Sequence, residues 1–133
     1  MNGSNNAISC QGAARRVTIH SMKLAPEPFG LIEAGRKTVE IRLFDTKRRC
    51  VMPEDIIRFT CTEDRRTFFV RVKEIAVFPT FEELYGYFEP GELGYPRESA
   101  GDAKEASPDD MYAYYTPENE LKYGVTGIRI EKI

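Results

Sequence analysis

The stretch DIIRFTCTEDRRTFFVRVKEIAVF, residues 55–78, is the part of the sequence that says most about the fold. Its first seven residues alternate apolar and polar side chains, which is typical of a strand with one buried face. The polar segment TEDRR then turns the chain, so residues 67–78 are predicted to pair back as an antiparallel hairpin. Between Val72 and Ile75 the apolar parity changes, which predicts a β-bulge near residues 73–74. Strands that bend in this way suit a small barrel.

Two more strands and a helix are predicted before the hairpin. Residues 17–24 and 35–43 both alternate between apolar and polar side chains. The segment APEPFGLIEAG between them has two early prolines and ends on Gly35, which are common start and stop signals of a helix. The basic segment DTKRRC that follows the second strand has room for one helical turn.

After the hairpin the sequence predicts helices and one closing strand. Thr80 and Glu83 have the spacing of a capping box, and an apolar helical stripe follows them. Residues 89–106 are rich in Gly, Pro and charge and predict a long surface loop. Two short helices with Ser/Thr–Pro starts come next, and the alternation in YGVTGIRIEKI predicts a last strand. The order predicts an α+β fold, a small, mixed, mostly antiparallel β-barrel with short helices packed at its openings.

Length and composition limit the function classes. The 133 residues are enough for one domain, so we expect a tail over residues 1–16 and a single domain over residues 17–133. No apolar run approaches the roughly 20 residues that span a bilayer, which predicts a soluble, cytoplasmic protein. Three scattered cysteines and a single histidine make a metal site or a disulfide framework improbable, and no cofactor motif is found.

The segment GRKTVEIRL, residues 35–43, holds the first candidate site. As a strand it carries Thr38, Glu40 and Arg42 on one face, with Lys37 at the junction before them. Once water is excluded, a carboxylate between two cations can take or give a proton, so Lys37 and Glu40 are candidate catalytic residues. Arg42 could fork onto a phosphate or carbonyl oxygen. The alternative is a solvated strand face with weak ion pairs, and the residue pattern alone favours it.

Aromatic and basic residues supply further candidates for ligand binding. Tyr112, Tyr115 and Tyr123 could stack on bases and donate hydroxyl hydrogen bonds, although the residue pattern favours packing of helices on the barrel. Arg36 and the KRR segment could contact phosphates, although most charge runs are solvated. Residues 1–78 carry 14 Lys and Arg against 9 Asp and Glu, whereas residues 79–133 carry 5 against 12. This asymmetry allows an anionic ligand on one side.

The segment GRKTVEIR matches the G-x-K-x-x-E-x-R signature of the ASCH domain family, which belongs to the PUA-like superfamily. The segments HSMKL, PEDIIRF, FPTFEEL, MYAYY and YGVTGIRI also resemble family segments and follow in the family's order. The resemblance covers about residues 17–131 and implies a partly open PUA-like β-barrel with a cleft beside the motif strand. It implies a role on RNA or modified nucleosides, in RNA processing or as a coactivator. Lys37, Glu40 and Arg42 correspond to the cleft residues, with Thr38 a weaker addition.

Two positions depart from patterns in this superfamily. Some members resemble amidohydrolases that remove an acetyl group from N-acetylated cytidine with a Lys and a Thr three residues apart. Here the second position is Glu40, which is a poor stand-in for a hydroxyl nucleophile. The Gly-Asp pair usual at the start of a strand is Glu54-Asp55 in this chain, a change that should affect the turn.

Three functions follow as hypotheses. The first is binding of RNA or a nucleotide in the cleft; the pI near 5.5 favours a short single strand, an end or one nucleotide over wide nonspecific binding. The second is a small hydrolase, amidohydrolase-like or ribonuclease-like, that acts on a modified nucleoside or RNA. The third is a non-catalytic domain that binds a protein partner and whose motif is structural. We expect a monomer or a weak dimer.

Overall fold

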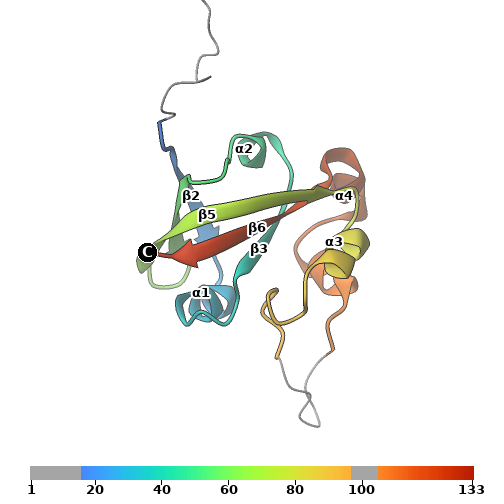
Figure 1. Cartoon of the computed structure of the whole chain (residues 1–133). Helices are drawn as coiled ribbons and strands as arrows, with labels where there is room; N and C mark the ends of the chain where they lie inside the picture. Colours follow the sequence, from blue (N-terminus) through green and yellow to red (C-terminus); the bar gives the residue numbers. More distant parts are fainter. Residues whose placement is uncertain (1–15, 97–104) are drawn as a thin grey trace, which may run out of the picture.

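The computed structural model describes residues 16–96 and 105–133 (Figure 1). The predicted tail over residues 1–16, except Arg16, and residues 97–104 of the predicted loop lie outside the described residues. The elements in chain order are β2 (Ile19–Leu24), α1 (Pro26–Glu33), β3 (Val39–Leu43), α2 (Thr46–Arg49), β4 (Ile56–Cys61), β5 (Thr67–Phe78), α3 (Phe81–Tyr87), the 3-10 helix η2 (Pro108–Ala113), α4 (Pro117–Tyr123) and β6 (Val125–Lys132).

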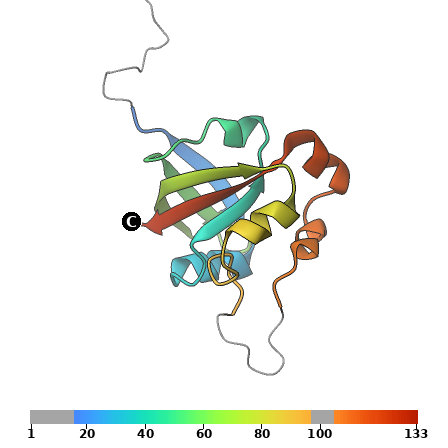
Figure 2. The same cartoon turned by 45° about the vertical axis from the view of Figure 1, so that its right-hand side comes forward.

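The strands of the described chain form one sheet of five strands in the order β2-β4-β5-β6-β3. Strands β2 and β4 are parallel, and the other three pairs are antiparallel. Figures 1 and 2 show that the sheet curls into a half-barrel, with α1 at one end and α3, η2 and α4 grouped beside β3 and β6. The predicted α+β class, the mixed, mostly antiparallel pairing and the short packed helices are therefore confirmed.

The predicted hairpin and bulge are both present in β4 and β5. The two strands pair antiparallel from Ile56 opposite Arg71 to Thr60 opposite Thr67. Where β5 continues onto β6, its register shifts between Val72 and Glu74, at the position the parity change predicts. The shift returns Ile75 to the packed side of the strand after one extra residue. The bulge thus lets one long strand follow the curl of the sheet.

Two apolar clusters form the core. The first lies between the curled strands and α1, and its fully buried members include Phe29, Ile57, Phe59, Val70 and Val72. The second packs β3 and β6 against the helices, through Val39, Ile41, Leu43, Phe81, Leu84, Phe88, Leu93 and Val125. The ring of Phe88 lies directly over Gly127, where a Cβ atom would collide with it. Helices α1 and α3 therefore each have one side packed on the sheet by buried apolar contacts.

Side-chain caps fix where the short helices begin. Thr80 Oγ1 accepts a hydrogen bond from the Glu83 N–H at 3.2 Å, as the capping-box spacing predicts. Ser107 and Thr116 cap η2 and α4 in the same way, each just before a proline. These caps matter because helices of only six or seven residues contribute little stability of their own.

A buried aspartate joins the first strand to the turn before β4. Asp55 is fully buried and accepts hydrogen bonds from the backbone N–H groups of Thr18 and Met52, at 3.1 and 3.0 Å. Asp55 Oδ2, the oxygen that accepts from Met52, also lies 2.8 Å from His20 Nε2. The preceding residue, Glu54, has a φ of 76°, a left-handed conformation that favours glycine. The turn therefore keeps the geometry of a Gly-Asp pair without the glycine.

Candidate functional site

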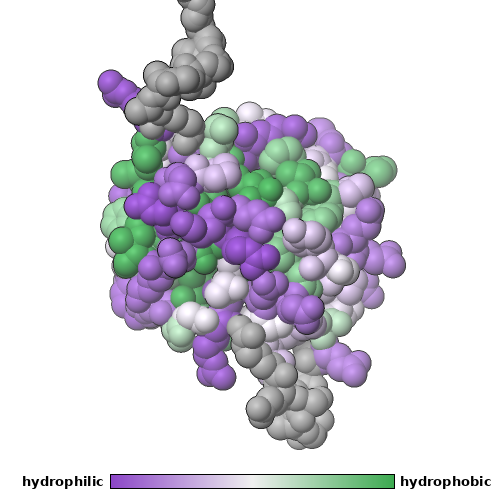
Figure 3. Space-filling model, viewed as in Figure 1, coloured by the Kyte–Doolittle hydropathy of each residue, from purple (hydrophilic) through white to green (hydrophobic). Residues whose placement is uncertain are grey.

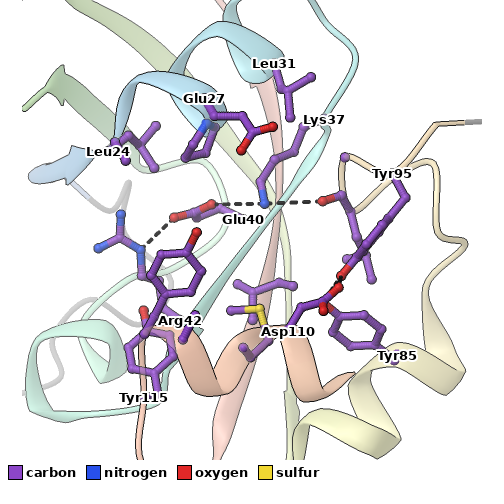
Figure 4. A pocket seen from close by; sticks show the side chains of 18 of the residues that line it. Leu24, Glu27, Leu31, Lys37, Glu40, Arg42, Tyr85, Tyr95, Asp110 and Tyr115 are labelled. Atoms are coloured by element: carbon purple, nitrogen blue, oxygen red, sulfur yellow. Dashed lines mark hydrogen bonds and ion pairs between the residues drawn. The ribbon is translucent and has the colours of Figure 1, made fainter. Parts of the chain in front are cut away.

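A cleft of about 900 Å³ opens at the edge of the half-barrel, between β2 and β3. It is lined by residues 23–25, 27 and 28 at the end of β2 and the start of α1, and by residues 93–96. Residues of η2 and the two tyrosines that follow Ala113 line it as well. Lys37 and residues 40–42 of the GRKTVEIRL segment complete the lining (Figure 4). Segments that lie far apart in the sequence therefore build the cleft together.

Lys37, Glu40 and Arg42 form a paired group in this cleft. Arg42 Nε donates a hydrogen bond to Glu40 Oε2 at 2.7 Å, and Lys37 Nζ lies 3.5 Å from Glu40 Oε1. The side chains are only 11%, 6% and 12% exposed for Lys37, Glu40 and Arg42. Each carboxylate oxygen thus faces one cation, and the group as a whole carries one net positive charge.

Strand β3 holds this group because both of its faces are covered. Val39, Ile41 and Leu43 pack into the second apolar cluster under the helices. Glu40 pairs with Ile128 of β6, so its side chain shares the face that carries the first apolar cluster. At 5% exposure Glu40 is not on a solvated strand face, the alternative that the residue pattern alone favoured.

Side chains bridge the opening between β2 and β3. Arg42 Nη2 donates to the Lys23 carbonyl at 2.7 Å, and Lys47 Nζ donates to the Ser21 carbonyl at 2.6 Å. These carbonyls belong to β2, an edge strand of the five-stranded sheet. A ladder of backbone hydrogen bonds between β2 and β3 would have closed the barrel. Because side chains bridge the two strands instead, the barrel stays open and the cleft has room.

The turn at residues 92–94 fixes Lys37 in place. The Glu92 carbonyl accepts hydrogen bonds from the N–H groups of Thr38 and Val39, both at 3.0 Å. The Lys37 ammonium donates to the Leu93 carbonyl at 3.3 Å. Gly94 has a φ of 101°, and a Cβ atom there would lie 3.2 Å from Lys37 Cδ. The glycine therefore allows the turn to approach the lysine stem closely.

A second polar group lines the opposite side of the cleft. Tyr95 donates its hydroxyl hydrogen to Asp110 Oδ2 at 2.6 Å, and the hydroxyls of Tyr85 and Tyr95 are 2.8 Å apart. Burial raises the pKa of Tyr85, and burial together with the bond to Asp110 raises the pKa of Tyr95. Figure 4 shows these three side chains on one side and Arg42 with Tyr115 on the other, with Glu40 between them. We call Tyr85, Tyr95 and Asp110 the tyrosine–aspartate group.

The structure brings together some of the residues that the sequence singled out and separates others. Lys37, Glu40, Arg42 and Tyr115 all line the cleft. Tyr115 also stacks on Phe81, with ring centroids 5.8 Å apart, and burial raises the pKa of its phenol. The predicted ligand-binding residues that do not line the cleft are Arg36, Thr38, Tyr112 and Tyr123.

Each of these four residues has a different setting. Arg36 is exposed and Thr38 is half-buried beside β3. The Tyr112 hydroxyl donates to Glu120 Oε1 at 2.6 Å, and Tyr123 packs against the second apolar cluster. The contacts of Tyr112 and Tyr123 match the alternative given for the tyrosines in the sequence analysis, which is packing of helices on the barrel.

Sequence reasoning missed Lys23 and the tyrosine–aspartate group. Tyr85 belongs to the apolar stripe of α3, so its position predicts packing and hides its hydroxyl. Tyr95 and Asp110 lie in or beside the segment predicted as a loop. Their meeting depends on contacts between segments ten to fifteen residues apart, for which no local periodicity exists.

The described residues hold no group of three or more His, Cys, Asp or Glu side chains placed to bind a metal ion. Within the same residues, Cys50 is exposed and Cys61 is buried, both as free thiols. None of the helices there is long and apolar enough to cross a membrane.

The model of the ASCH domain family matches residues 22–133. The chain belongs to the ASCH domain family. The match includes the GRKTVEIR segment and every element from β2 onward except the first three residues of that strand. The sequence resemblance to this family, given by six segments in order, is therefore confirmed. A search of curated proteins finds no match.

Solved structures share both the fold and, in two cases, substantial sequence. The hypothetical protein PH0355 is 34% identical with a TM-score of 0.71, and the alignment covers 87% of this chain and 100% of that chain. Protein PF0455 from Pyrococcus furiosus is 31% identical with a TM-score of 0.63, covering 87% and 98%. The ASCH protein from Zymomonas mobilis is 18% identical with a TM-score of 0.56, covering 86% and 67%, and supports the fold alone.

Proposed function

We propose that this ASCH domain binds RNA or a nucleotide in its cleft, with a role in RNA processing or metabolism. The observation that carries the proposal is the Lys37–Glu40–Arg42 group, nearly buried yet lining a cleft of about 900 Å³. Pockets that enclose small molecules commonly measure about 300–1,000 Å³, so the cleft has room for a nucleotide unit. Burying three charges is costly unless they serve a ligand or a fixed network.

The cleft offers the contacts that a nucleotide needs. Lys23, Lys37 and Arg42 provide cations for phosphate or carbonyl oxygens, and an arginine fork suits a phosphate. Tyr115 contributes an aromatic side chain to the lining, and bases stack well on such rings. The chain as a whole has a net charge of −2, so its affinity should depend on this cleft and not on a broad basic surface.

Titration of short single-stranded RNAs at two salt concentrations tests the proposal. Lys37→Ala and Arg42→Ala should each weaken binding by about ten- to a hundredfold, since removing one contact to a charged group costs roughly 1.5–3 kcal/mol. Lys73→Ala and Arg71→Ala are matched controls, because both residues are more exposed and pair with Glu54 outside the cleft. Binding that is absent at low salt, or equally strong in the cleft variants, would overturn the proposal.

A hydrolase on a modified nucleoside or RNA is the second candidate. It is favoured by Lys37 Nζ standing 3.5 Å from Glu40 Oε1, because such a pair can exchange a proton once a ligand excludes water. Glu40→Gln should then lower turnover by at least about a hundredfold, the usual size of an acid–base contribution, while ligand binding persists. A screen of acylated nucleosides and short RNAs in which wild type and Glu40→Gln are equally inactive would reject this function.

We also propose a cytoplasmic location for the protein. It is supported by the free thiols of Cys50 and Cys61, since reducing compartments keep thiols unpaired.

The remaining hypothesis for the function is a domain that binds a protein partner and whose G-x-K-x-x-E-x-R motif is structural. It predicts that Glu40→Ala lowers the melting temperature and changes no nucleotide affinity, so one melt beside one titration distinguishes it.

A further inference from the structure

The two hydroxyl groups of the tyrosine–aspartate group donate in a fixed order, Tyr85 to Tyr95 and Tyr95 to Asp110. A carboxylate can only accept, so the single hydroxyl hydrogen of Tyr95 goes to Asp110 Oδ2 at 2.6 Å, in preference to the Ser107 carbonyl at 3.4 Å. Tyr95 then has no hydrogen left for Tyr85. In the contact between their hydroxyls, at 2.8 Å, Tyr85 must therefore be the donor and Tyr95 the acceptor.

This fixed direction decides what the group can offer a ligand. The hydrogens of both tyrosines are used within the group, whose residues all line the cleft, so the Tyr85 oxygen and the Asp110 carboxylate can only accept from a ligand there. A carboxylate has about four acceptor positions and can receive ligand hydrogen bonds beside those it already has. The raised pKa values of Tyr85 and Tyr95 keep both phenols protonated at neutral pH, so the direction persists under ordinary conditions.

The two polar groups that line the cleft are thus opposite in hydrogen-bonding character. Arg42 and Lys37, beside Glu40, supply donors, whereas the tyrosine–aspartate group supplies acceptors (Figure 4). A ligand that fits both sides has acceptor oxygens at one end and N–H donors at the other. A nucleotide whose base carries an exocyclic amino group has this distribution, with phosphate and carbonyl oxygens to accept and an –NH₂ to donate.

We infer that the tyrosine–aspartate group reads the exocyclic amino group of a base and selects amino-bearing nucleotides against uridine. The inference rests on the proposed nucleotide binding and adds the substrate class. Uracil presents a carbonyl oxygen where cytosine presents its amino group, so a uridine nucleotide would place an acceptor against acceptors. A buried acceptor left without a donor loses affinity, which is the source of the selection.

Cytidine and uridine 5′-monophosphates form a matched pair of probes, because they differ at the amino group and the adjacent ring nitrogen. Calorimetric titration of the wild-type chain should show cytidine monophosphate binding about tenfold or more tightly, within the range of one good base contact. Tyr85→Phe and Asp110→Asn should reduce this ratio to less than about threefold, because each removes acceptors. Asp110→Asn should also improve uridine binding, since an amide can donate to the uracil oxygen.

Two controls separate recognition from folding. Tyr87→Phe changes a tyrosine on the same helix, α3, that is 56% exposed and does not line the cleft. Glu118→Gln changes an exposed carboxylate on α4 in the same way that Asp110→Asn changes a carboxylate to an amide. Both should keep the wild-type ratio, and a far-ultraviolet melt of each variant shows whether it is folded at the temperature of the titration.

The outcomes distinguish this inference from the proposed function. If both nucleotides bind with equal affinity and Lys37→Ala weakens both, nucleotide binding stands and the amino-group inference fails. A preference for uridine, or a cytidine preference unchanged in Tyr85→Phe and Asp110→Asn, also overturns the inference. If neither nucleotide binds and short RNAs fail as well, the proposed function fails and the inference fails with it.

Discussion

Asp55 and Glu40 are two carboxylates that the same small barrel buries in different ways. Asp55 is 0% exposed and is held by two backbone N–H groups and the His20 ring. Glu40 is 5% exposed and is held by the side chains of Lys37 and Arg42. Backbone donors cannot leave their acceptor without unfolding the turn, whereas cationic side chains beside a cleft can turn toward a ligand. The kind of donor, more than the degree of burial, therefore distinguishes Asp55 from Glu40, for which we propose a role in ligand binding.

The surroundings of the two carboxylates support this distinction. Asp55 ties the residues before β2 to the turn before β4, where no cleft residue lies. The face shown in Figure 3 carries a hydrophilic surface over β5 and β6, and ion pairs such as Glu74–Arg129 belong to those strands. The side chains of Arg129 and Glu74 are each more than one-third exposed, so their ion pair contributes little to stability. The Lys37–Glu40–Arg42 group differs from this pair in being nearly buried, and from Asp55 in lining the cleft.

The largest effect expected is on stability, from Asp55→Asn. The amide would place an NH₂ group where Asp55 now accepts from backbone N–H groups, so donors would face donors at a fully buried position. We expect a loss of about 3 kcal/mol in the free energy of unfolding, as for a broken buried charged network. Urea denaturation measures it. Asp64→Asn, a partly exposed aspartate in the β4–β5 turn, serves as the control and should change stability far less. A loss below about 1 kcal/mol would contradict the structural role.

Glu40→Gln is the matched carboxylate-to-amide change on the other side of the comparison. Water in the cleft can hydrate Lys37 and Arg42 when their counter-charge is removed, so the free energy of unfolding should fall by only about 1 kcal/mol. Ligand binding or turnover should change instead, as the proposed function requires. The same urea experiment applies to both variants. If Glu40→Gln costs as much stability as Asp55→Asn and alters neither ligand affinity nor turnover, the distinction between the two carboxylates is wrong.

The sequence predicted the fold closely because its signals are local. The alternation in residues 55–78, the parity change before Ile75 and the Thr80–Glu83 spacing each depend on neighbours within a few residues. The structure confirms the hairpin, the bulge between Val72 and Glu74, and the cap. Local geometry decides these features, so periodicity alone is enough to find them.

The site was only partly accessible from the sequence because its second side is assembled across the chain. Alternation placed Glu40 and Arg42 on one face, but it could not show that the face is covered, since that depends on the pairing with β6. Tyr85, Tyr95 and Asp110 meet through three separate segments. Tyr112 and Tyr115 have the same chemistry and lie three residues apart, yet only Tyr115 lines the cleft. Which side of a short helix faces a cleft is decided by tertiary packing.

A smaller and opposite effect is expected at the turn beside Asp55. Glu54 adopts a φ of 76°, which costs an L-residue other than glycine roughly 1 kcal/mol. Glu54→Gly should therefore stabilise the chain by up to about 1 kcal/mol, reduced by the flexibility that glycine adds to the unfolded state. Its ion pairs with Lys73 and Arg71 are exposed, so their loss should offset little of the gain. Glu54→Ala is the control that removes those pairs and keeps the strain; stabilisation by alanine equal to that by glycine would refute the backbone explanation.

Glu120 extends the comparison to a third carboxylate and gives the smallest effect, which appears only at high pH. It is 7% exposed and accepts from the Phe81 backbone N–H at 2.7 Å, as Asp55 does from backbone groups, and from the Tyr112 hydroxyl at 2.6 Å. The bond to Glu120 raises the pKa of Tyr112 to about 12, from an ordinary value of 10.0. The folded state therefore favours the protonated phenol. This contribution to stability is complete below the ordinary pKa and is lost as the pH rises from about 10 to about 12.

Alkaline titration of tyrosinate absorbance tests this, with the spectrum of Tyr112→Phe subtracted from that of the wild type. The difference should titrate near pH 12, and Glu120→Gln should lower that midpoint because a neutral amide repels the phenolate less. A midpoint near 10 in the wild type would mean that the Tyr112–Glu120 bond does not persist in solution. Glu120 would then depend on the Phe81 N–H alone, and a backbone donor would still be what marks it as a structural carboxylate.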